Sequence, residues 1–282
     1  MTNEGGGPSR LGSVTVYPAG SRGDVAATAT ITGDNTGLLA PDGVTLDSGG
    51  NIYVANFLGG SAGSVTIYPP LGSSTGTLDE EPTATIGGLY LGPDNTGLKY
   101  PSGVALDSSG NIYVANFGGT DGSITVYPPL GSSTGSLNEA PTATIAGPNT
   151  GLIGAQGGIT LDSGGNMYVP NCVVGCNGSS NDTITVYPPL GSSTGTLDET
   201  PTATITGPTT GLGAPVGVVL DADGNFYVTN DGSYPNNIGA VTVYRPLGSK
   251  KGTLDEAPIA RIVGSKTLLA APHGIAIGPF VP

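Results

Sequence analysis

Short runs rich in apolar and β-branched residues, separated by clusters of polar and turn-forming residues, recur along the whole chain. In one stretch these runs cover residues 103–106, 111–115, 123–127 and 142–145. Val, Ile, Thr and Tyr dominate the runs, and Gly, Pro, Asn or Ser bound them, which is typical of short β-strands joined by tight turns. Gly or Pro interrupts almost every ten-residue window, so long helices are not expected.

The runs belong to a repeat. The phrase Pro-x-Gly-Val-x-Leu-Asp-x-x-Gly-Asn-Ile-Tyr-Val-Ala-Asn occurs at residues 41–56 and 101–116, more loosely at 156–171 and 215–230, and in shortened form from residue 272. A second phrase, Val-Thr-Val-Tyr-Pro, occurs five times, with steps of 51, 59, 60 and 57 residues between its tyrosines. Four short antiparallel strands repeating at this period are the pattern of a β-propeller, in which one period forms one blade.

The phase of the repeat predicts how the ring closes. We expect an all-β, five-bladed β-propeller with four-stranded antiparallel blades, formed as a single domain by residues 1–282. The complete blades cover approximately residues 41–92, 101–148, 156–208 and 215–264, and a composite blade combines residues 272–282 with 11–33. Only five residues follow Ile277, so the second strand of this blade is either vestigial or missing. A missing strand would leave unpaired backbone groups, which favour self-association or strand donation by a partner.

Composition changes this picture little. Gly contributes 50 residues and Pro 24, but 37% of the chain is hydrophobic and only 10% charged, which is the opposite of a disordered chain. The net charge is −13, and eight scattered Lys and Arg residues form no basic patch, so nucleic-acid binding is excluded. No apolar run is long enough to span a membrane. The acidic, weakly charged surface favours an extracellular or cell-surface location, and an export signal is expected outside this chain.

The stretch Gly-Val-Ala-Leu-Asp-Ser-Ser-Gly-Asn-Ile-Tyr-Val-Ala-Asn, residues 103–116, closely resembles the NHL repeat. The resemblance covers the first half of four blades and, weakly, the fifth, and the added Tyr-Pro-Pro-Leu-Gly-Ser-Ser-Thr-Gly segment is similar to bacterial, often exported propellers of this type. It implies a propeller, in a family of scaffolds, ligand binders and a few enzymes such as virginiamycin B lyase and the peptidylglycine amidating lyase. Those enzymes use His and acidic residues around the central channel, and some of these residues bind metal ions. The single His of this chain cannot form a multi-His metal site.

Loops at one face of a propeller are the usual place for binding, and two kinds of residue lie there. An Asn ends the second strand of four blades, where it either ties the loop to its own backbone or presents an amide to a polar ligand. The next residue is Phe in two blades, which predicts an apolar lip. The predicted ligand-binding residues are Asn56, Phe57, Asn116, Phe117, Asn171, Asn230, Asp231 and His273.

His273 is the only His, and it precedes the first strand of the composite blade. Asp42 holds the equivalent position in the next blade round the predicted ring. An Asp42–His273 pair at the channel mouth is therefore the candidate for acid–base catalysis, although no recognisable nucleophile accompanies it. The other interpretation is an exposed loop histidine.

Cys172 and Cys176 are the only cysteines, and both follow the second strand of the third complete blade. Two cysteines and one His cannot build a tetrahedral zinc site, and three intervening residues are not the two-residue redox spacing. We expect a local disulfide, which implies an oxidising compartment. Two free thiols are the alternative.

Two sets of carboxylates recur. Asp47, Asp107, Asp162 and Asp221 occupy the first hairpin of each blade, where they either cap the turn or form a weak calcium site; no other cofactor is expected. The phrase Leu-Asp-Glu-x-Pro, at residues 78–82, 197–201 and 254–258, lies in loops at the opposite face. It is either solvated charge or a rim that binds cations or a basic partner.

No coherent set of acid, base, nucleophile and metal ligands emerges from these residues. The leading hypothesis is a non-catalytic, exported scaffold or binding module for a protein or glycan ligand, with homo-oligomeric self-assembly as a structural variant. The alternative is an NHL-type lyase or hydrolase with its site at the channel mouth.

Overall fold

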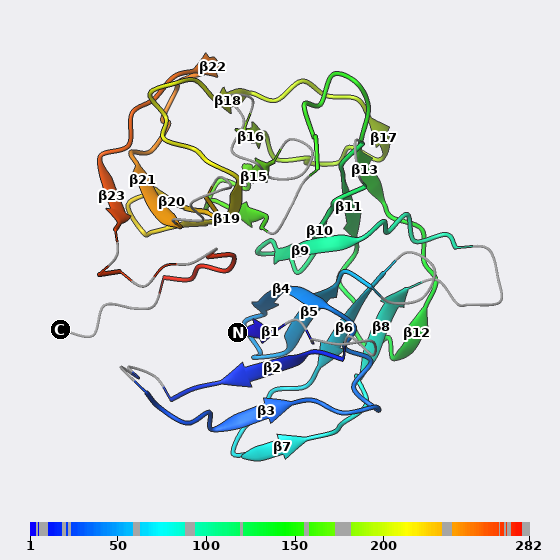
Figure 1. Ribbon diagram of the computed structural model, residues 1–282. Coiled ribbons are helices and arrows are strands. Elements are labelled where there is room, and N and C mark those ends of the chain that lie inside the picture. The colour runs from blue at the N-terminus through cyan, green and yellow to red at the C-terminus, as the bar shows by residue number, and fades with distance from the viewer. Residues whose placement is uncertain are drawn as a thin grey trace. The chain divides into compact units, whose positions relative to one another are not determined.

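The computed structural model of the chain is all-β (Figure 1). It describes residues 1–3, 5, 11–18, 21, 24–58, 63–87, 94–118, 121–154, 158–172, 182–232, 239–264, 266–267, 269 and 272–277. The strands form five sheets, and the fold is a five-bladed β-propeller, as the repeat predicts. Among the described residues, no helix combines the length and hydropathy of a membrane span.

The second sheet shows how one repeat folds. Its strands are β4 (Pro41–Leu46), β5 (Ile52–Asn56), β6 (Ser64–Tyr68) and β8 (Ala84–Gly87), and each is antiparallel to the next. The hairpin between β4 and β5 closes at Gly50, whose φ of 85° suits a residue without a Cβ atom. Because β5 and β6 are buried along their whole length, the apolar runs form the middle of the blade.

Three further sheets repeat this order. The third contains β9 (Pro101–Leu106), β10 (Ile112–Asn116), β11 (Ser123–Tyr127) and β13 (Ala143–Ile145). The fourth contains β14 (Thr160–Leu161), β15 (Met167–Asn171), β16 (Thr183–Tyr187) and β18 (Ala203–Ile205). The fifth contains β19 (Pro215–Leu220), β20 (Phe226–Asn230), β21 (Ala240–Tyr244) and β23 (Ala260–Val263).

The first sheet is completed differently from the predicted composite blade. It contains β1 (Thr2–Asn3), β2 (Ser13–Val16) and β3 (Ala29–Ile31). β1 pairs antiparallel with β2, with Thr2 opposite Val14, and so occupies the place expected for a C-terminal strand. Residues 272–277 form no strand, and residues 278–282 lie outside the described part of the chain. The N-terminal residues thus pair with the edge of β2 where a C-terminal strand was expected, and a contribution of residues 272–282 to this sheet stays a prediction.

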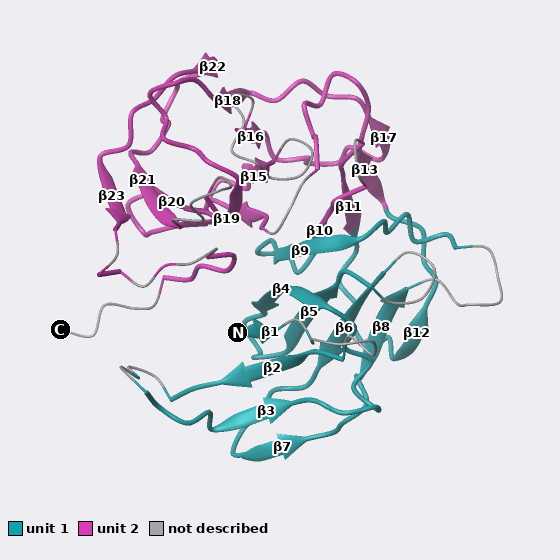
Figure 2. Ribbon diagram, in the orientation of Figure 1, with its two compact units in different colours: residues 1–114, 127–141, 278–282 teal, residues 115–126, 142–277 magenta. Residues whose placement is uncertain are grey.

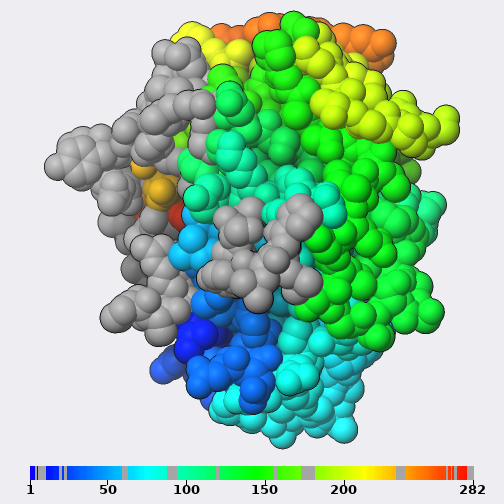
Figure 3. Space-filling model, turned by 90° about the vertical axis from the view of Figure 1, so that its right-hand side faces the viewer, coloured from blue at the N-terminus to red at the C-terminus, as the bar shows by residue number. Residues whose placement is uncertain are grey.

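The loop between the third and fourth strands of a repeat contributes an extra strand, which the sequence did not predict. We call the segments β7 (Gly76–Leu78), β12 (Gly135–Leu137), β17 (Gly195–Leu197) and β22 (Gly252–Leu254) the straps. Each strap pairs in parallel with the fourth strand of the preceding sheet, which is β3, β8, β13 or β18 respectively. The straps add an outer strand to four sheets, and the one around β17 stands at the surface (Figure 3, yellow-green).

The chain divides into two compact units, which Figure 2 colours separately. The first comprises Met1–Val114, Tyr127–Pro141 and Gly278–Pro282, and its core includes Ile31, Tyr53 and Tyr68. The second comprises Ala115–Val126 and Thr142–Ile277. In its core, the ring of Phe226 stacks on Tyr244 with centroids 4.8 Å apart and lies 5.6 Å from Tyr168. Aromatic side chains at matching repeat positions therefore fill both cores.

Candidate functional site

The four strand-ending asparagines are buried and bound to the protein itself. Asn56 is 0% exposed; its Nδ2 donates to Thr66 Oγ1 at 3.1 Å, and its Oδ1 accepts from the backbone N of Leu39 at 3.2 Å. The same Asn-to-Thr bond recurs at 2.9–3.1 Å in the other three blades, in the pairs Asn116–Thr125, Asn171–Thr185 and Asn230–Thr242. These amides tie the third strand to the loop that enters the first strand. Ligand binding by them stays a prediction.

A second repeated contact fixes the same entry loops, and it was not predicted. The hydroxyl of Tyr68 donates to the carbonyl of Thr36, and Tyr244 donates to Thr210 at 2.7 Å. The equivalent bonds of the third and fourth sheets are Tyr127 to Thr96 and Tyr187 to Thr150. Burial raises the pKa of both Tyr68 and Tyr244 to about 12. The signal in the sequence was a Thr-Gly-Leu triplet at residues 36–38, 96–98, 150–152 and 210–212.

The residue before the first strand adopts a left-handed backbone in three blades. The φ angles are 47° for Ala40, 55° for Tyr100 and 52° for Ala214, and each of these residues precedes a proline. Non-glycine residues in this region cost about 1–3 kcal/mol each and are kept only where their surroundings hold them. The side chain of Asp182 holds the backbone of Ala214 in place. Asp182 is 3% exposed, and its Oδ2 accepts a hydrogen bond from the backbone N–H of Ala214 at 2.6 Å. Sequence reasoning missed Asp182.

An aromatic pair, with Phe57 half-buried and Tyr100 exposed, lies beside this strained backbone in the first unit. Phe57 and Tyr100 have ring centroids 5.2 Å apart, with their planes tilted by 31°. Tyr100 is 41% exposed, and the backbone N of Phe57 donates to the carbonyl of Ala40 at 3.0 Å. The predicted apolar lip thus consists here of Phe57 and Tyr100, whereas Phe117 is a half-buried residue of the second unit. Ligand binding at these residues stays a prediction.

His273 has an acidic neighbour in the second unit. Its Nε2 lies 4.0 Å from Oδ2 of Asp231, and the two side chains are 48% and 27% exposed. The backbone carbonyl of His273 accepts from Thr229 Oγ1 at 2.7 Å, and a Cβ on Gly217 would meet that carbonyl at 2.4 Å. The structure therefore holds the His273 backbone beside Asp231, two members of the predicted ligand-binding set. Asp42 belongs to the first unit, where its carbonyl accepts from Thr2 Oγ1, and its pairing with His273 stays a prediction.

The hairpin aspartates cap their turns. Asp47 accepts hydrogen bonds from the backbone N of Gly49 and Asn51 at 2.9 Å and from Asn51 Nδ2 at 2.7 Å. Burial opposes ionisation of Asp47, but these hydrogen bonds outweigh it and lower its pKa below the ordinary value. The same contacts recur at Asp107, Asp162 and Asp221. The carboxylates are therefore engaged in the turns, and the weak calcium site stays a prediction. The described residues contain no group of three or more His, Cys, Asp or Glu placed to hold a metal ion.

The recurring Leu-Asp-Glu segments anchor the straps. Asp79 Oδ1 accepts from the backbone N of Asn35 at 2.9 Å, and its Oδ2 accepts from Asn35 Nδ2 at 3.1 Å. Asp198 binds Asn149 in the same way, and Asp255 binds Thr209. After the strap β12, Asn138 takes the place of the aspartate and accepts from the backbone N of Asn95. The strap carboxylates thus hold a neighbouring loop, which the sequence did not reveal.

Cys172, a predicted disulfide partner, is 1% exposed at the end of β15. Cys176 lies outside the described residues, so the disulfide stays a prediction.

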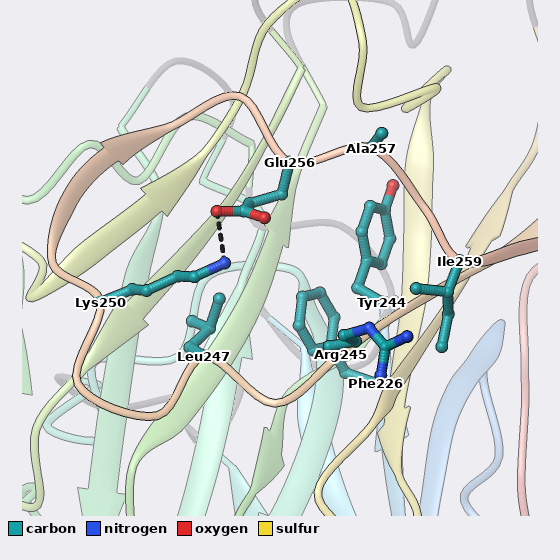
Figure 4. Close-up of a pocket in the computed structure, with 8 residues that line it drawn as sticks. All are labelled: Phe226, Tyr244, Arg245, Leu247, Lys250, Glu256, Ala257 and Ile259. Atoms are coloured by element: carbon teal, nitrogen blue, oxygen red, sulfur yellow. Dashed lines mark hydrogen bonds and ion pairs between the residues drawn. The ribbon is translucent and has the colours of Figure 1, made fainter.

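The second unit also has a small hollow of about 150 Å³ beside β21 (Figure 4). Figure 4 shows Phe226 and Tyr244 at its base and an ion pair between Lys250 Nζ and Glu256 Oε1, 2.7 Å long, at its side. Arg245 and Ile259 line the part nearest β23. The hollow is too small for most ligands of drug size.

Comparison with known proteins supports the repeat and the fold. Residues 98–126 match the model of the NHL repeat. No curated protein matches the chain. The chain therefore carries an NHL repeat within a β-propeller, as its sequence indicates.

Solved structures with a similar fold have diverse roles. The PQQ-bound aldose sugar dehydrogenase of Streptomyces coelicolor matches with a TM-score of 0.54 and 20% identity, over 96% of this chain and 76% of that one. A Bacteroides caccae protein of unknown function has a TM-score of 0.54 and 10% identity, over 93% and 78%. PorZ, a surface component of the type-IX secretion system of Porphyromonas gingivalis, has a TM-score of 0.51 and 13% identity, over 93% and 31%. The fold thus occurs in an enzyme and in a secretion component, and it does not fix the function.

Proposed function

We propose that this NHL-repeat β-propeller is a non-catalytic binding scaffold, exported or held at the cell surface, that recognises a protein or glycan ligand through its variable loops. The observation that carries the proposal is the Phe57–Tyr100 pair, a partly exposed aromatic platform in which Tyr100 is 41% exposed and Phe57 is half-buried. Aromatic rings contribute large contact areas at low entropic cost when their backbone is already ordered.

The distribution of polar groups supports this proposal. The residues that repeat in every blade, such as Asn56 and Tyr68, use their side chains in internal hydrogen bonds. Positions that differ between blades are left for recognition. After the strand-ending Asn these are Phe57, Phe117 and Asp231, whereas Cys172 at the same position is buried. A constant frame with variable loop residues is the arrangement by which propellers and other scaffolds acquire binding specificity.

A matched pair of tyrosine variants tests the platform. The intact chain is screened against an array of defined oligosaccharides and a displayed peptide library, and each binder is titrated against the variants. We expect Tyr100→Ala and Phe57→Ala to weaken binding at least tenfold, about the value of an aromatic contact in a binding site. Tyr17→Ala is the control, because Tyr17 is also 41% exposed. Equal losses in Tyr100→Ala and Tyr17→Ala would contradict the platform, and a chain without any binder would contradict the scaffold.

The predicted disulfide provides a test of the proposed extracellular or cell-surface location. If the protein is exported, Cys172 and Cys176 form a disulfide, so neither thiol is alkylated before reduction. Mass spectrometry of protein purified without reductant measures this directly. Alkylation of both thiols in unreduced, unfolded protein would favour a reducing compartment instead.

A second candidate function is acid–base catalysis by His273, as a lyase or hydrolase. It is favoured by the Asp231 carboxylate 4.0 Å from the imidazole, because a carboxylate can orient and stabilise a protonated imidazole. Turnover of a panel of esters and lactones measures the activity. Loss in both His273→Ala and Asp231→Asn, with activity kept in Asp42→Asn, would support this pair. Turnover unaffected by His273→Ala would exclude it.

A further inference from the structure

A second hollow, of about 290 Å³, lies between the fourth and fifth sheets, and we call it the interblade hollow. Its lining includes Asp162, Tyr168, Leu220, Asp223, Leu247 and Lys250. All of these residues belong to the second unit. Pockets for small molecules start at about 300 Å³, so the interblade hollow suits a ligand of one ring.

In two other sheets the tyrosine of the second strand is hydrogen-bonded to the aspartate of the first hairpin. Tyr113 donates to Asp107 Oδ2 at 3.3 Å, and Tyr227 donates to Asp221 Oδ2 at 3.2 Å. In the second sheet, burial raises the pKa of Tyr53, and the charge of its hairpin aspartate and a hydrogen bond to it add to this effect. The bond between tyrosine and aspartate is thus a regular part of the repeat.

Tyr168, at the same position in the fourth sheet, lacks this bond. Burial and then the charge of Asp162 raise the pKa of Tyr168, and no hydrogen bond from the described residues contributes. Tyr168 is only 5% exposed, yet no fully buried polar side-chain atom of the described residues is without a partner. The small exposed part of Tyr168 therefore includes its hydroxyl, at the wall of the interblade hollow. A polar group in such a recess needs a partner from outside the fold.

Asp162 has a free acceptor position that matches this donor. Its Oδ1 accepts from the backbone N of Gly164 and of Asn166 at 2.9 Å, and its Oδ2 accepts from Asn166 Nδ2 at 2.8 Å. In the third and fifth sheets the tyrosine fills the second position on Oδ2, whereas here that position stays available. The interblade hollow thus offers one donor, from Tyr168, and one acceptor, on Asp162.

The rest of the lining combines apolar and charged groups. Leu247 is 8% exposed and Leu220 is half-buried, and they provide apolar surface. Asp223 and Lys250 are exposed, and the ammonium of Lys250 is already paired with Glu256 (Figure 4). A sugar ring has the complementary character, because it carries C–H groups on its faces and hydroxyls around its edge.

We propose that the interblade hollow binds one ring of a neutral saccharide, with a sugar hydroxyl that accepts from Tyr168 and donates to Asp162 Oδ2. A hydroxyl does both at once, whereas an ammonium or guanidinium group has no acceptor and a carboxylate has no donor. The bond to the ionised Asp162 is of the stronger, charge-assisted kind. The site lies in the second unit and shares no residue with the Phe57–Tyr100 platform, so either proposal can fail alone.

Nuclear magnetic resonance of the intact chain, labelled with ¹³C at the tyrosine ζ carbon, locates the binding. The probes are the methyl glycosides of glucose, galactose and mannose, and Tyr168→Phe identifies the signal of Tyr168. We expect at least one probe to shift this signal with a saturable dose dependence. Disaccharides ending in the same sugar distinguish the sources, because they bind equally well if the site takes the end of a glycan and weakly if it takes a free monosaccharide.

Two variants with matched controls test the contacts, and saturation-transfer measurements on the sugar give their affinities. Tyr168→Phe should weaken binding about tenfold, because it removes the donor. Tyr113→Phe is its control, since the Tyr113 hydroxyl is already bonded to Asp107 and the residue is 7% exposed.

Ala222→Trp should abolish binding, because Ala222 is exposed and lines the hollow from the hairpin of the fifth sheet. Ser108→Trp, at the equivalent exposed position of the third sheet, is its control and should leave binding unchanged. Circular dichroism checks that each variant keeps its β-sheet.

Three results would overturn the proposal. The first is a Tyr168 signal that no sugar shifts, which would mean that the hollow holds only water. The second is sugar binding that persists in both Tyr168→Phe and Ala222→Trp, which would place the sugar elsewhere. The third is a stronger response of Tyr168 to butylammonium or methylguanidinium than to any sugar, which would assign the hollow to a cation.

Discussion

β18 and β23 are the fourth strands of two consecutive sheets, and among the described residues a strap pairs with β18 but none pairs with β23. β18 has the sequence Ala-Thr-Ile and pairs with the strap β22, and its Ala203 and Ile205 are buried in a cluster that includes Phe226 of the next sheet. β23 has the related sequence Ala-Arg-Ile-Val, and all four of its residues are exposed. The difference in side-chain exposure therefore comes from what surrounds each strand, a strap and the following sheet in the case of β18, and hardly from the sequence of the strand itself. Protection of a sheet edge in this protein is supplied by the following repeat.

The largest expected difference is the cost of truncating the matching isoleucines. Ile205→Ala removes a fully buried side chain, and we expect it to lower the free energy of unfolding by about 2–5 kcal/mol. Ile262→Ala, at a position 51% exposed, should change it by less than about 0.5 kcal/mol. Urea unfolding at low protein concentration measures both. Equal costs would mean that Ile262 is buried in solution.

Protein stability at alkaline pH tests whether the lack of a strap on β23 among the described residues affects the interior of its blade. Burial raises the pKa of Tyr68, in a sheet with a strap, and of Tyr244, in the sheet without one, to about 12. A raised tyrosine pKa stabilises the fold fully below the ordinary value of 10.0, and this contribution is lost as the pH rises through 12. Each tyrosine contributes about 2 kcal/mol on this basis.

Replacement by phenylalanine separates the two tyrosines. We expect both Tyr68→Phe and Tyr244→Phe to reduce the loss of stability between pH 10 and 12, by similar amounts. Chemical unfolding at each pH, with ultraviolet titration of the phenolates, follows the effect. A much smaller effect for Tyr244→Phe would show that the difference between the edges extends to the third strand.

The anchor carboxylates are expected to have a smaller effect. Asp198→Ala removes two hydrogen bonds to Asn149, of 2.8 and 2.9 Å, and should destabilise the protein by about 1 kcal/mol because the pair is exposed. Asp198→Asn should cost less than half as much, because Asn138 already performs this role in another strap. Asp34→Asn, outside any strap, is the control. Thermal unfolding compares the three variants, and equal losses in Asp198→Ala and Asp34→Asn would show that the strap contacts do not contribute.

The contrast between the edges also marks the limit of the sequence prediction. The runs at residues 111–115 and 123–127 predicted β10 and β11 to within a residue, because their strong apolar patterns pair with neighbours close in the sequence. The straps were predicted as loops, because a strand such as Gly195–Leu197 is three residues long, exposed and flanked by turn residues. Its pairing with β13 is parallel and distant in sequence, so no local pattern reveals it.

The candidate site shows the same limit. The positions of Asn56 and Phe57 followed from the repeat, but their partners did not. Thr66 lies across the sheet from Asn56, and Tyr100 belongs to the following repeat. For His273 the sequence suggested Asp42 and the structure shows Asp231, which stands next to the repeated Asn and was noted only as a binding residue. Contacts between repeats depend on how the sheets pack, and a single sequence does not contain that information.

The smallest expected effect is on stability at acid pH, compared between a sheet with a strap and the sheet in which none is described. Asp47 and Asp221 cap the first hairpins of a sheet with a strap and of the sheet without one. Burial opposes ionisation of Asp47, but the hydrogen bonds of its turn outweigh burial and lower its pKa. The pKa of Asp221 is lowered mainly by the hydrogen bond from the Asn225 side chain. Both pKa values are therefore below the ordinary value of 3.8. The unfolded state then binds more protons than the folded state, so this stability is present above pH 3.8 and is lost as the pH falls through the lowered pKa values.

We therefore expect Asp47→Asn and Asp221→Asn to flatten the acid limb of the stability curve slightly and equally, because each hairpin joins the first two strands of its sheet, away from the fourth strand. Urea unfolding between pH 2 and 5 measures the slope. A flattening confined to Asp47→Asn would mean that the absence of a strap on β23 loosens its sheet as far as the first strand.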